Sequence, residues 1–325
     1  METTQDSIQR FAERISAFET ELAKVVVGQQ EAVRGVLAAL LADGHVLIEG
    51  VPGLGKTLLA RAVSKLIDAK FSRIQFTPDL MPSDVTGGHV FNMQTREFDF
   101  HPGPVFANVL LADEINRAPA KTHAALLEVM QERHVTVDRT TFVLDWPFFT
   151  LATQNPIESE GTYALPAAQL DRFMFKLIVG YLPQGHEQDV LTRAITPGGS
   201  PEEALEQLKP VFDPAGLLEL RGLAGRVTVE PPLVQYATEL IRASRTWPDL
   251  IQGASSRAGI ALLKGARVLA LLDARDYVVP DDVQALFQPA LRHRVILAPE
   301  AEVEGRDVDA VLDSVRDSVE VPRSR

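Results

Sequence analysis

Residues 50–57, with the sequence GVPGLGKT, constrain the fold of this chain more than any other feature. They fit the pattern G-x-x-x-x-G-K-[ST], and they stand between an apolar run at 45–48 and a helical pattern at 58–67. Such a loop needs a buried strand before it and a helix after it, because backbone N–H groups and the helix N-terminus together bind phosphate oxygens. The sequence therefore predicts an α/β domain that binds the phosphates of a nucleotide.

The individual positions of this loop have distinct expected roles. We expect Lys56 to reach the β and γ phosphates of ATP and the Thr57 hydroxyl to be a ligand of Mg²⁺. The other predicted nucleotide-binding residues in and directly after the loop are Gly50, Pro52, Gly53, Leu54, Gly55 and Leu58.

A second apolar strand, residues 109–112, ends in the carboxylates Asp113 and Glu114. Ligands of open α/β sheets bind at the carboxyl ends of the strands, which is where this pair is predicted to lie. Asp113 suits a magnesium ligand, and Glu114 suits the general base for water that attacks the γ-phosphate. Taken alone, an acidic pair is also typical of a helix N-terminus, but the upstream loop favours the catalytic interpretation.

A third strand, around residues 148–151, leads into Asn155. Its amide would emerge at the same edge of the sheet, within reach of the γ-phosphate, and could report phosphate occupancy. In isolation, Asn-Pro is usually only a turn.

Apolar spacing divides the chain into two predicted domains. Residues 1–183 alternate strands with helices, beginning with an amphipathic helix, and this alternation predicts a doubly wound parallel sheet. Two segments, 89–100 and 134–144, interrupt the alternation and are predicted β-hairpins. The strand signal then fades, and helix starts such as the capping box at Ser200 predict an all-α lid domain over 184–325.

Composition excludes several classes of function. The chain has 325 residues and no cysteine, which excludes disulfides, thiolate nucleophiles and cysteine-bound zinc. A net charge of −12 argues against a general affinity for nucleic acid or anionic membranes. No stretch has the pattern of a signal peptide or a membrane helix, so we expect a cytoplasmic protein without membrane insertion.

The order and wording of these motifs resemble the AAA+ ATPases, and within them the MoxR family, over nearly the full length. The resemblance is carried by residues 27–29, 50–57, 77–84, 102–104, 112–118, 126–133, 153–156, 161–163 and 169–173. It implies a AAA+ core with a helical lid, with ATP and Mg²⁺ as cofactors.

The resemblance also implies roles for residues that the sequence alone does not single out. Asn155 would be the sensor-1 residue, Arg172 an arginine finger acting on a neighbouring subunit, and Arg257 the sensor-2 arginine, in cis or in trans. A finger of this kind can be worth about 10³ to 10⁵ in rate. Val27 and Gly28, with the preceding valine, would flank the adenine ring. Without the resemblance, Arg172 would be read as a surface residue that caps a helix before a strand, and Arg257 as the partner of an acid near a helix start.

The chain departs from the family pattern at Ser256, where a proline is usual, and this change could loosen the segment that carries Arg257. The two predicted hairpins correspond to insertions that face the central pore in related ring motors. The resemblance therefore implies a hexameric ring that remodels a protein client, together with a separate partner bearing a von Willebrand factor A domain.

Two other functions remain open on the sequence. A DNA or RNA motor is the main alternative, because replicative helicases share this AAA+ branch, although the acidic balance weighs against it. A small-molecule kinase could use the same loop, but it would leave the arginine finger and the lid unexplained.

Overall fold

The fold is that of a computed structural model, which describes residues 4–156, 163–196 and 199–322. Gly161 and Thr162, part of one of the motifs above, lie outside the described residues.

The predicted doubly wound sheet is confirmed. The described residues form a five-stranded sheet in which every neighbouring pair is parallel. Its spatial order is β2 (Phe71–Gln75), β5 (Val109–Asp113), β8 (Phe149–Gln154), β1 (Val46–Glu49) and β9 (Phe175–Ile178). The three central strands are buried almost throughout, which is why they appear in the sequence as continuous apolar runs.

Helices cover both faces of this sheet. On β5, Val109 and Leu111 pack into one hydrophobic cluster while Leu110 and Ala112 pack into a second, because successive side chains of a strand point to opposite faces. The first cluster is covered by α1 (Thr4–Ala23), α2 (Gln30–Leu41) and α3 (Lys56–Leu66), and the second by α5 (Ala120–Glu132). The amphipathic first helix is confirmed, because the side chains spaced three and four residues apart along its apolar face are buried: Ile8, Phe11, Ile15, Phe18 and Leu22.

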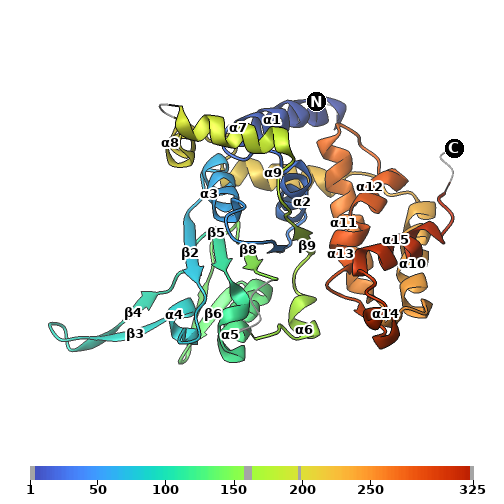
Figure 1. Cartoon of the computed structure of the whole chain (residues 1–325). Helices are drawn as coiled ribbons and strands as arrows, with labels where there is room; N and C mark the ends of the chain where they lie inside the picture. Colours follow the sequence, from blue (N-terminus) through green and yellow to red (C-terminus); the bar gives the residue numbers. More distant parts are fainter. Residues whose placement is uncertain (1–3, 157–162, 197–198, 323–325) are drawn as a thin grey trace.

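The segment 184–325, which the sequence assigns to the lid, begins with three helices that return over the α/β domain. They are α7 (Gln184–Ile195), α8 (Pro201–Gln207) and α9 (Pro214–Ala224). In Figure 1, α7 and α8 lie above α3, and α9 lies behind it. The predicted capping box is present: Ser200 Oγ accepts from Glu203 N at 3.2 Å, and Ser200 N donates to the Glu203 carboxylate at 3.3 Å. The segment is fixed to the core where Val211 N and Phe212 N both donate to Leu66 O.

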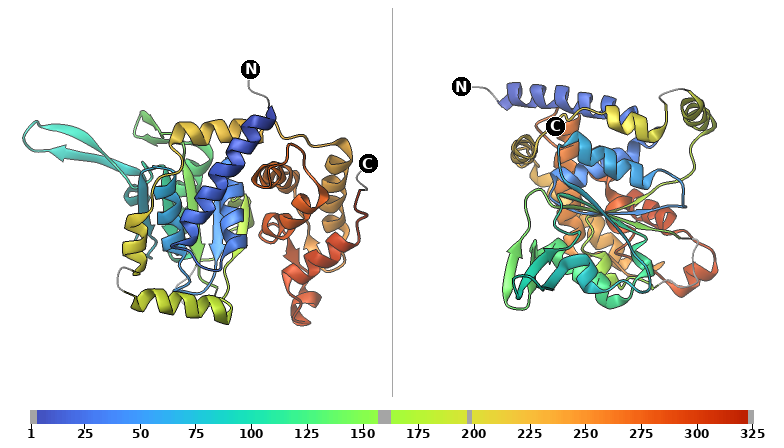
Figure 2. Two further views of the ribbon diagram at one scale, coloured as in Figure 1. Left: turned by 90° about the horizontal axis from the view of Figure 1, so that it is seen from above. Right: turned by 90° about the vertical axis from the view of Figure 1, so that its left-hand side faces the viewer.

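The lid stands beside the edge strand β9, as a separate layer in Figure 1 and in the left view of Figure 2. Its helices are α10 (Pro231–Thr246), α11 (Ser256–Leu272), α12 (Pro280–Ala285), α13 (Phe287–Leu291), α14 (Pro299–Val303) and α15 (Val308–Asp317). A Cβ on Gly265 would lie 2.6 Å from the Phe175 ring, so a glycine is needed where α11 packs on β9.

The lid is helical as predicted, with one addition to an all-α domain. β10 (Leu250–Gln252) pairs antiparallel with β11 (Ile296–Leu297). Strands of two and three residues are too short to produce a detectable alternation in the sequence.

Both predicted hairpins are present. The first consists of β3 (Gly87–Asn92) and β4 (Glu97–Pro102), follows the short helix α4 (Pro82–Thr86), and projects far from the body of the molecule (Figure 2). The second consists of β6 (His134–Val137) and β7 (Thr140–Val143). The rings of Phe100 and Phe142 stack at 3.9 Å between centroids and join the two hairpins.

The turn of the second hairpin, which lacks a glycine, is made by Asp138 at a φ of 55°. Aspartate is among the few residues that tolerate this left-handed conformation. Its carboxylate also contacts His89 Nδ1 at 2.9 Å, which adds a second link between the hairpins.

Within the described ranges, each helix is too short or too polar to cross a bilayer.

Candidate functional site

The phosphate-binding loop leaves the carboxyl end of β1 and opens α3. Gly53 and Gly55 have φ angles of +86° and +78°, a left-handed conformation that residues with a Cβ rarely adopt. No atom lies within 4 Å of the position of a Cβ at either glycine, so this stretch of backbone faces open space. The loop therefore presents its backbone, followed directly by the N-terminus of α3, as a cradle for phosphate.

Lys56 folds back over this loop. Its Nζ donates to Gly50 O and to Val51 O, the latter at 3.3 Å. Partial burial lowers the pKa of Lys56, while Asp113 and Glu114 oppose the shift. The ammonium thus occupies a place where phosphate oxygens could replace carbonyl oxygens as its partners.

Asp113 ends β5 and is held from both sides. The Thr153 hydroxyl donates to Oδ1 at 2.5 Å, and Arg73 donates to Oδ2 through Nε at 3.1 Å and Nη2 at 2.7 Å. These contacts come from β8 and β2, the two strands that flank β5 in the sheet. They fix the orientation of a carboxylate that lines the cavity in front of the loop.

Glu114 follows in a left-handed conformation, with a φ of 54°, at the start of the short 3₁₀ helix η1 (Ile115–Arg117). Its N–H donates to Thr153 Oγ1 at 2.9 Å, and its Oε2 accepts from Gln75 Nε2 at 2.7 Å. Arg117 Nε lies 3.2 Å from the same oxygen. The strained backbone turns Glu114 away from the strand direction and toward the cavity that it lines with Asp113.

A cavity of about 540 Å³ connects these groups. Its predicted members, from the loop, the acidic pair and the third strand, are Pro52, Gly53, Leu54, Gly55, Lys56, Thr57, Leu58, Asp113, Glu114 and Asn155. Asn155 is buried and directly follows the carboxyl end of β8, as expected from the sequence. Val26 and Val27 form an apolar wall together with Val190 of α7 and Pro201 of α8.

Gly28 lies behind this wall rather than on it. It lines neighbouring hollows, and its φ is +69°. A Cβ at this position would lie 2.7 Å from His186 Nδ1, so the glycine allows α7 to approach the loop that holds the two valines. Gly28 therefore supports the wall indirectly, by allowing α7 to pack closely.

The donor set fits a nucleotide with a divalent cation. The glycine backbone and Lys56 suit phosphate oxygens, the apolar wall suits a base, and the Thr57 hydroxyl and Asp113 carboxylate are oxygen ligands of the type that Mg²⁺ prefers. No group of three or more His, Cys, Asp or Glu side chains that could hold a metal ion by themselves is found in the described part of the chain.

Arg172 and Arg257 are not in this cavity. They line a different hollow of about 420 Å³ that shares no residue with it and includes Gly44, the residue two before β1. Arg172 lies three residues before β9, which runs parallel to β1 with Val46 opposite Phe175. The two arginines therefore lie at the amino ends of these strands, whereas the phosphate-binding loop lies at the carboxyl end of β1.

The lid is docked at this arginine-bearing end by three consecutive residues that bind backbone carbonyls of the core. Arg292 Nη1 donates to Lys176 O at 3.1 Å, His293 Nε2 to Phe173 O at 3.0 Å, and Arg294 Nη1 to Met174 O at 3.0 Å. Burial lowers the pKa of His293 well below its usual value, which keeps the ring neutral with the proton on Nε2.

Sequence reasoning missed Arg73, Gln75, Arg117 and Thr153, which surround the two carboxylates. Gln75 is paired with Asp113 in the strand register, although 38 positions separate them in the chain. The strand that carries Arg73 and Gln75 was itself missed, because β2 is an edge strand with one buried residue and no apolar run. Its place next to β5 is visible only in the folded sheet.

Comparisons with known proteins match two parts of the chain to protein families. Residues 45–175 match the family described as "ATPase family associated with various cellular activities (AAA)", and residues 242–315 match the family described as "AAA lid domain". The chain is 40% identical to a protein of known crystal structure from Cytophaga hutchinsonii, with a TM-score of 0.89 and 97% of each chain covered.

Full-length relatives give the narrower family. Chaperone MoxR1 of Mycobacterium tuberculosis is 43% identical over 313 residues, which cover 93% of this chain and 81% of the relative. Protein MoxR of Methylorubrum extorquens is 35% identical over 321 residues, with 92% of both proteins covered. The resemblance drawn from the motifs is thereby confirmed: the chain belongs to the MoxR family of AAA+ ATPases.

Proposed function

We propose that this protein hydrolyses ATP as a ring, with six subunits as the expected number, in which each site is completed by Arg172 and Arg257 of the adjacent subunit. One observation carries the proposal: both arginines lie on one hollow at the amino ends of β1 and β9, away from the loop at the carboxyl end of β1. A head-to-tail ring brings such opposite surfaces of neighbouring subunits together.

Within one subunit, the residues of the cavity bind and orient the triphosphate. The loop glycines and Lys56 hold the β and γ phosphates, and Val26 and Val27 contact the base. Thr57 and Asp113 would hold Mg²⁺, which supplies charge neutralisation on the β and γ phosphate oxygens. Glu114 accepts the proton of the attacking water at a carboxylate oxygen, and Asn155 orients that water or the γ-phosphate.

The transferring phosphoryl group needs more positive charge around it than the loop of one subunit supplies. Lys56 is the cation of the loop itself, and the guanidinium groups of Arg172 and Arg257 would arrive from the neighbour. This arrangement makes hydrolysis depend on assembly and couples the lid of one subunit to the nucleotide of the next.

We further propose that hydrolysis remodels a protein client, in concert with a separate partner bearing a von Willebrand factor A domain. The projecting hairpin supports a protein client. Its outer half exposes Phe98 to 67% and Met93 to 86%, beside the acidic side chains of Glu97 and Asp99. A tip with exposed apolar side chains and only one arginine, Arg96, among its charges fits hydrophobic segments of a protein better than the phosphate backbone of nucleic acid, so the nucleic-acid motor is less well supported.

A subunit-mixing experiment tests the shared site. We expect Lys56→Ala and Arg172→Ala to be inactive separately, because the first lacks nucleotide binding and the second lacks the finger. In an equal mixture, one neighbouring pair in four combines an intact loop with an intact finger, so about a quarter of wild-type ATPase should return if the pairs act independently.

Arg96→Ala, which removes an exposed arginine at the hairpin tip, is the matched control and should be fully active alone. Failure of the mixture to exceed the sum of its components, in rings that form normally, would refute the shared site. Nucleotide binding by Arg172→Ala, measured by fluorescence titration, should be unchanged.

A further inference from the structure

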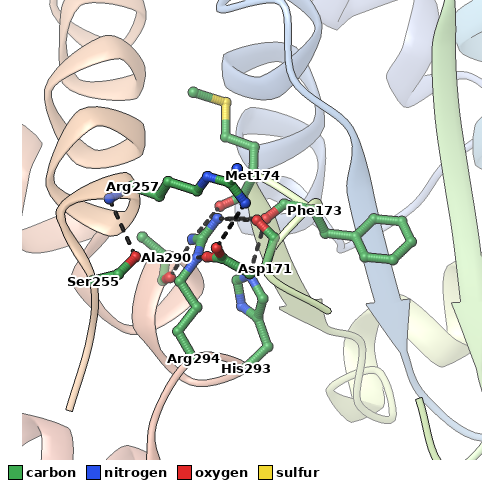
Figure 3. Close-up of polar contacts among 8 residues, drawn as sticks. All are labelled: Asp171, Phe173, Met174, Ser255, Arg257, Ala290, His293 and Arg294. Atoms are coloured by element: carbon green, nitrogen blue, oxygen red, sulfur yellow. Dashed lines mark hydrogen bonds and ion pairs between the residues drawn. The ribbon is translucent and has the colours of Figure 1, made fainter. Parts of the chain in front are cut away.

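Asp171 is shared between two arginines that come from different parts of the lid. It caps the short helix α6 (Ala167–Leu170), directly before Arg172. Its Oδ1 accepts from Arg294 Nε at 2.7 Å, and its Oδ2 accepts from Arg257 Nη1 at 3.0 Å. Figure 3 shows the two guanidinium groups converging on this one carboxylate.

The two arginines are held very differently. The Arg294 side chain is 5% exposed and uses all its donors, with further bonds to Met174 O, Ala290 O, Phe173 O and Asp171 O. The Arg257 side chain is 61% exposed, and Asp171 is the partner of its guanidinium. Arg294 is thus held rigidly. Among the residues that the structure describes, the guanidinium of Arg257 has one partner, Asp171, at a solvent-exposed contact.

The two carboxylate oxygens of Asp171 therefore have different roles: Oδ1 binds the fixed Arg294, and Oδ2 binds the exposed Arg257. Arg294 fixes Asp171 and the backbone of the turn that carries Arg172 relative to the lid, and the fixed Asp171 then determines where the Arg257 guanidinium lies. A long arginine side chain loses considerable freedom when it is held, so a residue that holds it in advance reduces the entropic cost of binding a phosphate.

We propose that Asp171 is a positioning residue that presents Arg257 beside Arg172, so that both cations meet the nucleotide of the neighbouring subunit together. This inference rests on the shared site of the proposed function. It also explains why Ser256 can stand where the family usually has a proline. Ser255 caps α11 and Asp171 orients the Arg257 side chain, so the rigidity of a proline is not required at the start of this helix.

The test is Asp171→Asn in the full-length ring. The asparagine amide oxygen can still accept from Arg294, whose four carbonyl contacts remain, so folding and ring assembly should be normal. Loss of the exposed contact to Arg257 should lower kcat for ATP about two- to fivefold, the range expected for an exposed ion pair. Nucleotide affinity of the isolated subunit should not change, because Asp171 is absent from its own nucleotide cavity.

Asp309→Asn is the matched control. Asp309 accepts from Arg292 Nε at 2.9 Å, so the same substitution weakens lid docking through the neighbouring arginine without contacting Arg257 or Arg172. We expect this control to keep wild-type kcat. An equal loss of kcat in both variants would assign Asp171 a merely structural role and overturn the proposal.

A double-mutant cycle provides the second readout. Asp171→Asn should have no further effect on kcat in an Arg257→Ala background, because the two residues act through one contact. Full additivity, or a higher kcat in Asp171→Asn as expected if the carboxylate competes with phosphate for Arg257, would overturn the inference. If Arg172→Ala and Arg257→Ala themselves leave kcat unchanged, the shared site fails instead, so the two failures can be distinguished.

Discussion

Gln75 Nε2 donates a hydrogen bond to Glu114 Oε2 at 2.7 Å, across the boundary between the edge strand β2 and its neighbour β5. Arg117 approaches the same oxygen. Both donors lie on the oxygen Oε2, which is thereby occupied and less free to accept the proton of an attacking water. In the conformation described here, Gln75 therefore restrains the proposed general base.

We predict that Gln75→Ala raises the basal ATPase rate about tenfold, since a hydrogen bond to a charged carboxylate is worth about 1.5 kcal/mol. Nucleotide affinity should not change, because the loop is untouched. Steady-state kinetics compares this variant with Gln207→Ala, an exposed glutamine of α8, as control. A lower rate in Gln75→Ala would show instead that Gln75 aligns the base for attack.

For Glu114→Gln, we predict retained ATP binding with hydrolysis reduced at least 100-fold, because the amide cannot accept the proton of the attacking water. Glutamine preserves the length of the side chain, so the cavity should keep its shape. Binding of a fluorescent ATP analogue and release of phosphate measure the two properties on the same sample. Wild-type turnover would contradict the role of Glu114 as base.

Two glycines, one with a left-handed backbone and one in a regular helix, are predicted to respond in opposite ways to alanine. Gly55→Ala forces a Cβ onto a residue with a φ of +78°, at a strain of about 1 to 2 kcal/mol, and should weaken ATP binding because the cradle must rearrange. Gly222→Ala, in an exposed turn of α9 with open space around the new methyl group, should stabilise the fold by about 0.5 to 1 kcal/mol. Thermal unfolding and nucleotide titration of both variants check this contrast.

The central strands and the phosphate-binding loop were predictable because their signals are local. Residues 45–57 contain strand, loop and helix start in one continuous segment, and Asp113 directly follows its own strand. The companions of the carboxylates were not predictable in this way. Thr153 and Gln75 reach Asp113 and Glu114 through the order of strands in the sheet, which no local pattern encodes.

The position of the lid was likewise not predictable from local sequence patterns. The sequence predicted its helices but not that it docks at the opposite end of β1 from the phosphate-binding loop. That position depends on Arg292, His293 and Arg294, whose partners are backbone carbonyls and therefore leave no mark in the residue types of the core.

The stack of Phe100 on Phe142 predicts that the two hairpins act as one unit. Phe142→Ala should release the first hairpin and increase its cleavage by chymotrypsin severalfold, because loss of an aromatic pair removes about 1 kcal/mol beyond burial. ATP binding should be unaffected. Val143→Ala, which shortens an exposed neighbour on the same strand, is the control and should leave the cleavage rate unchanged.

His45 gives the chain a predictable sensitivity to acid. Its buried ring donates from Nε2 to Met130 O at 3.0 Å and accepts from Thr150 N on Nδ1 at 3.0 Å, so only the neutral ring satisfies both partners. Burial lowers the pKa of His45 to about 4. The stabilisation is fully present above the unfolded value of about 6.5 and is lost as pH falls from there toward 4.

We therefore predict that His45 contributes a loss of about 2 kcal/mol in the free energy of unfolding between pH 7.5 and 5.0, because the unfolded chain binds a proton that the folded chain excludes. Urea denaturation at both pH values measures the loss. His45→Asn should be less stable at pH 7.5 but should decline less toward pH 5.0. The exposed His101→Asn should keep the full wild-type decline, and an identical decline in all three proteins would contradict the assignment to His45.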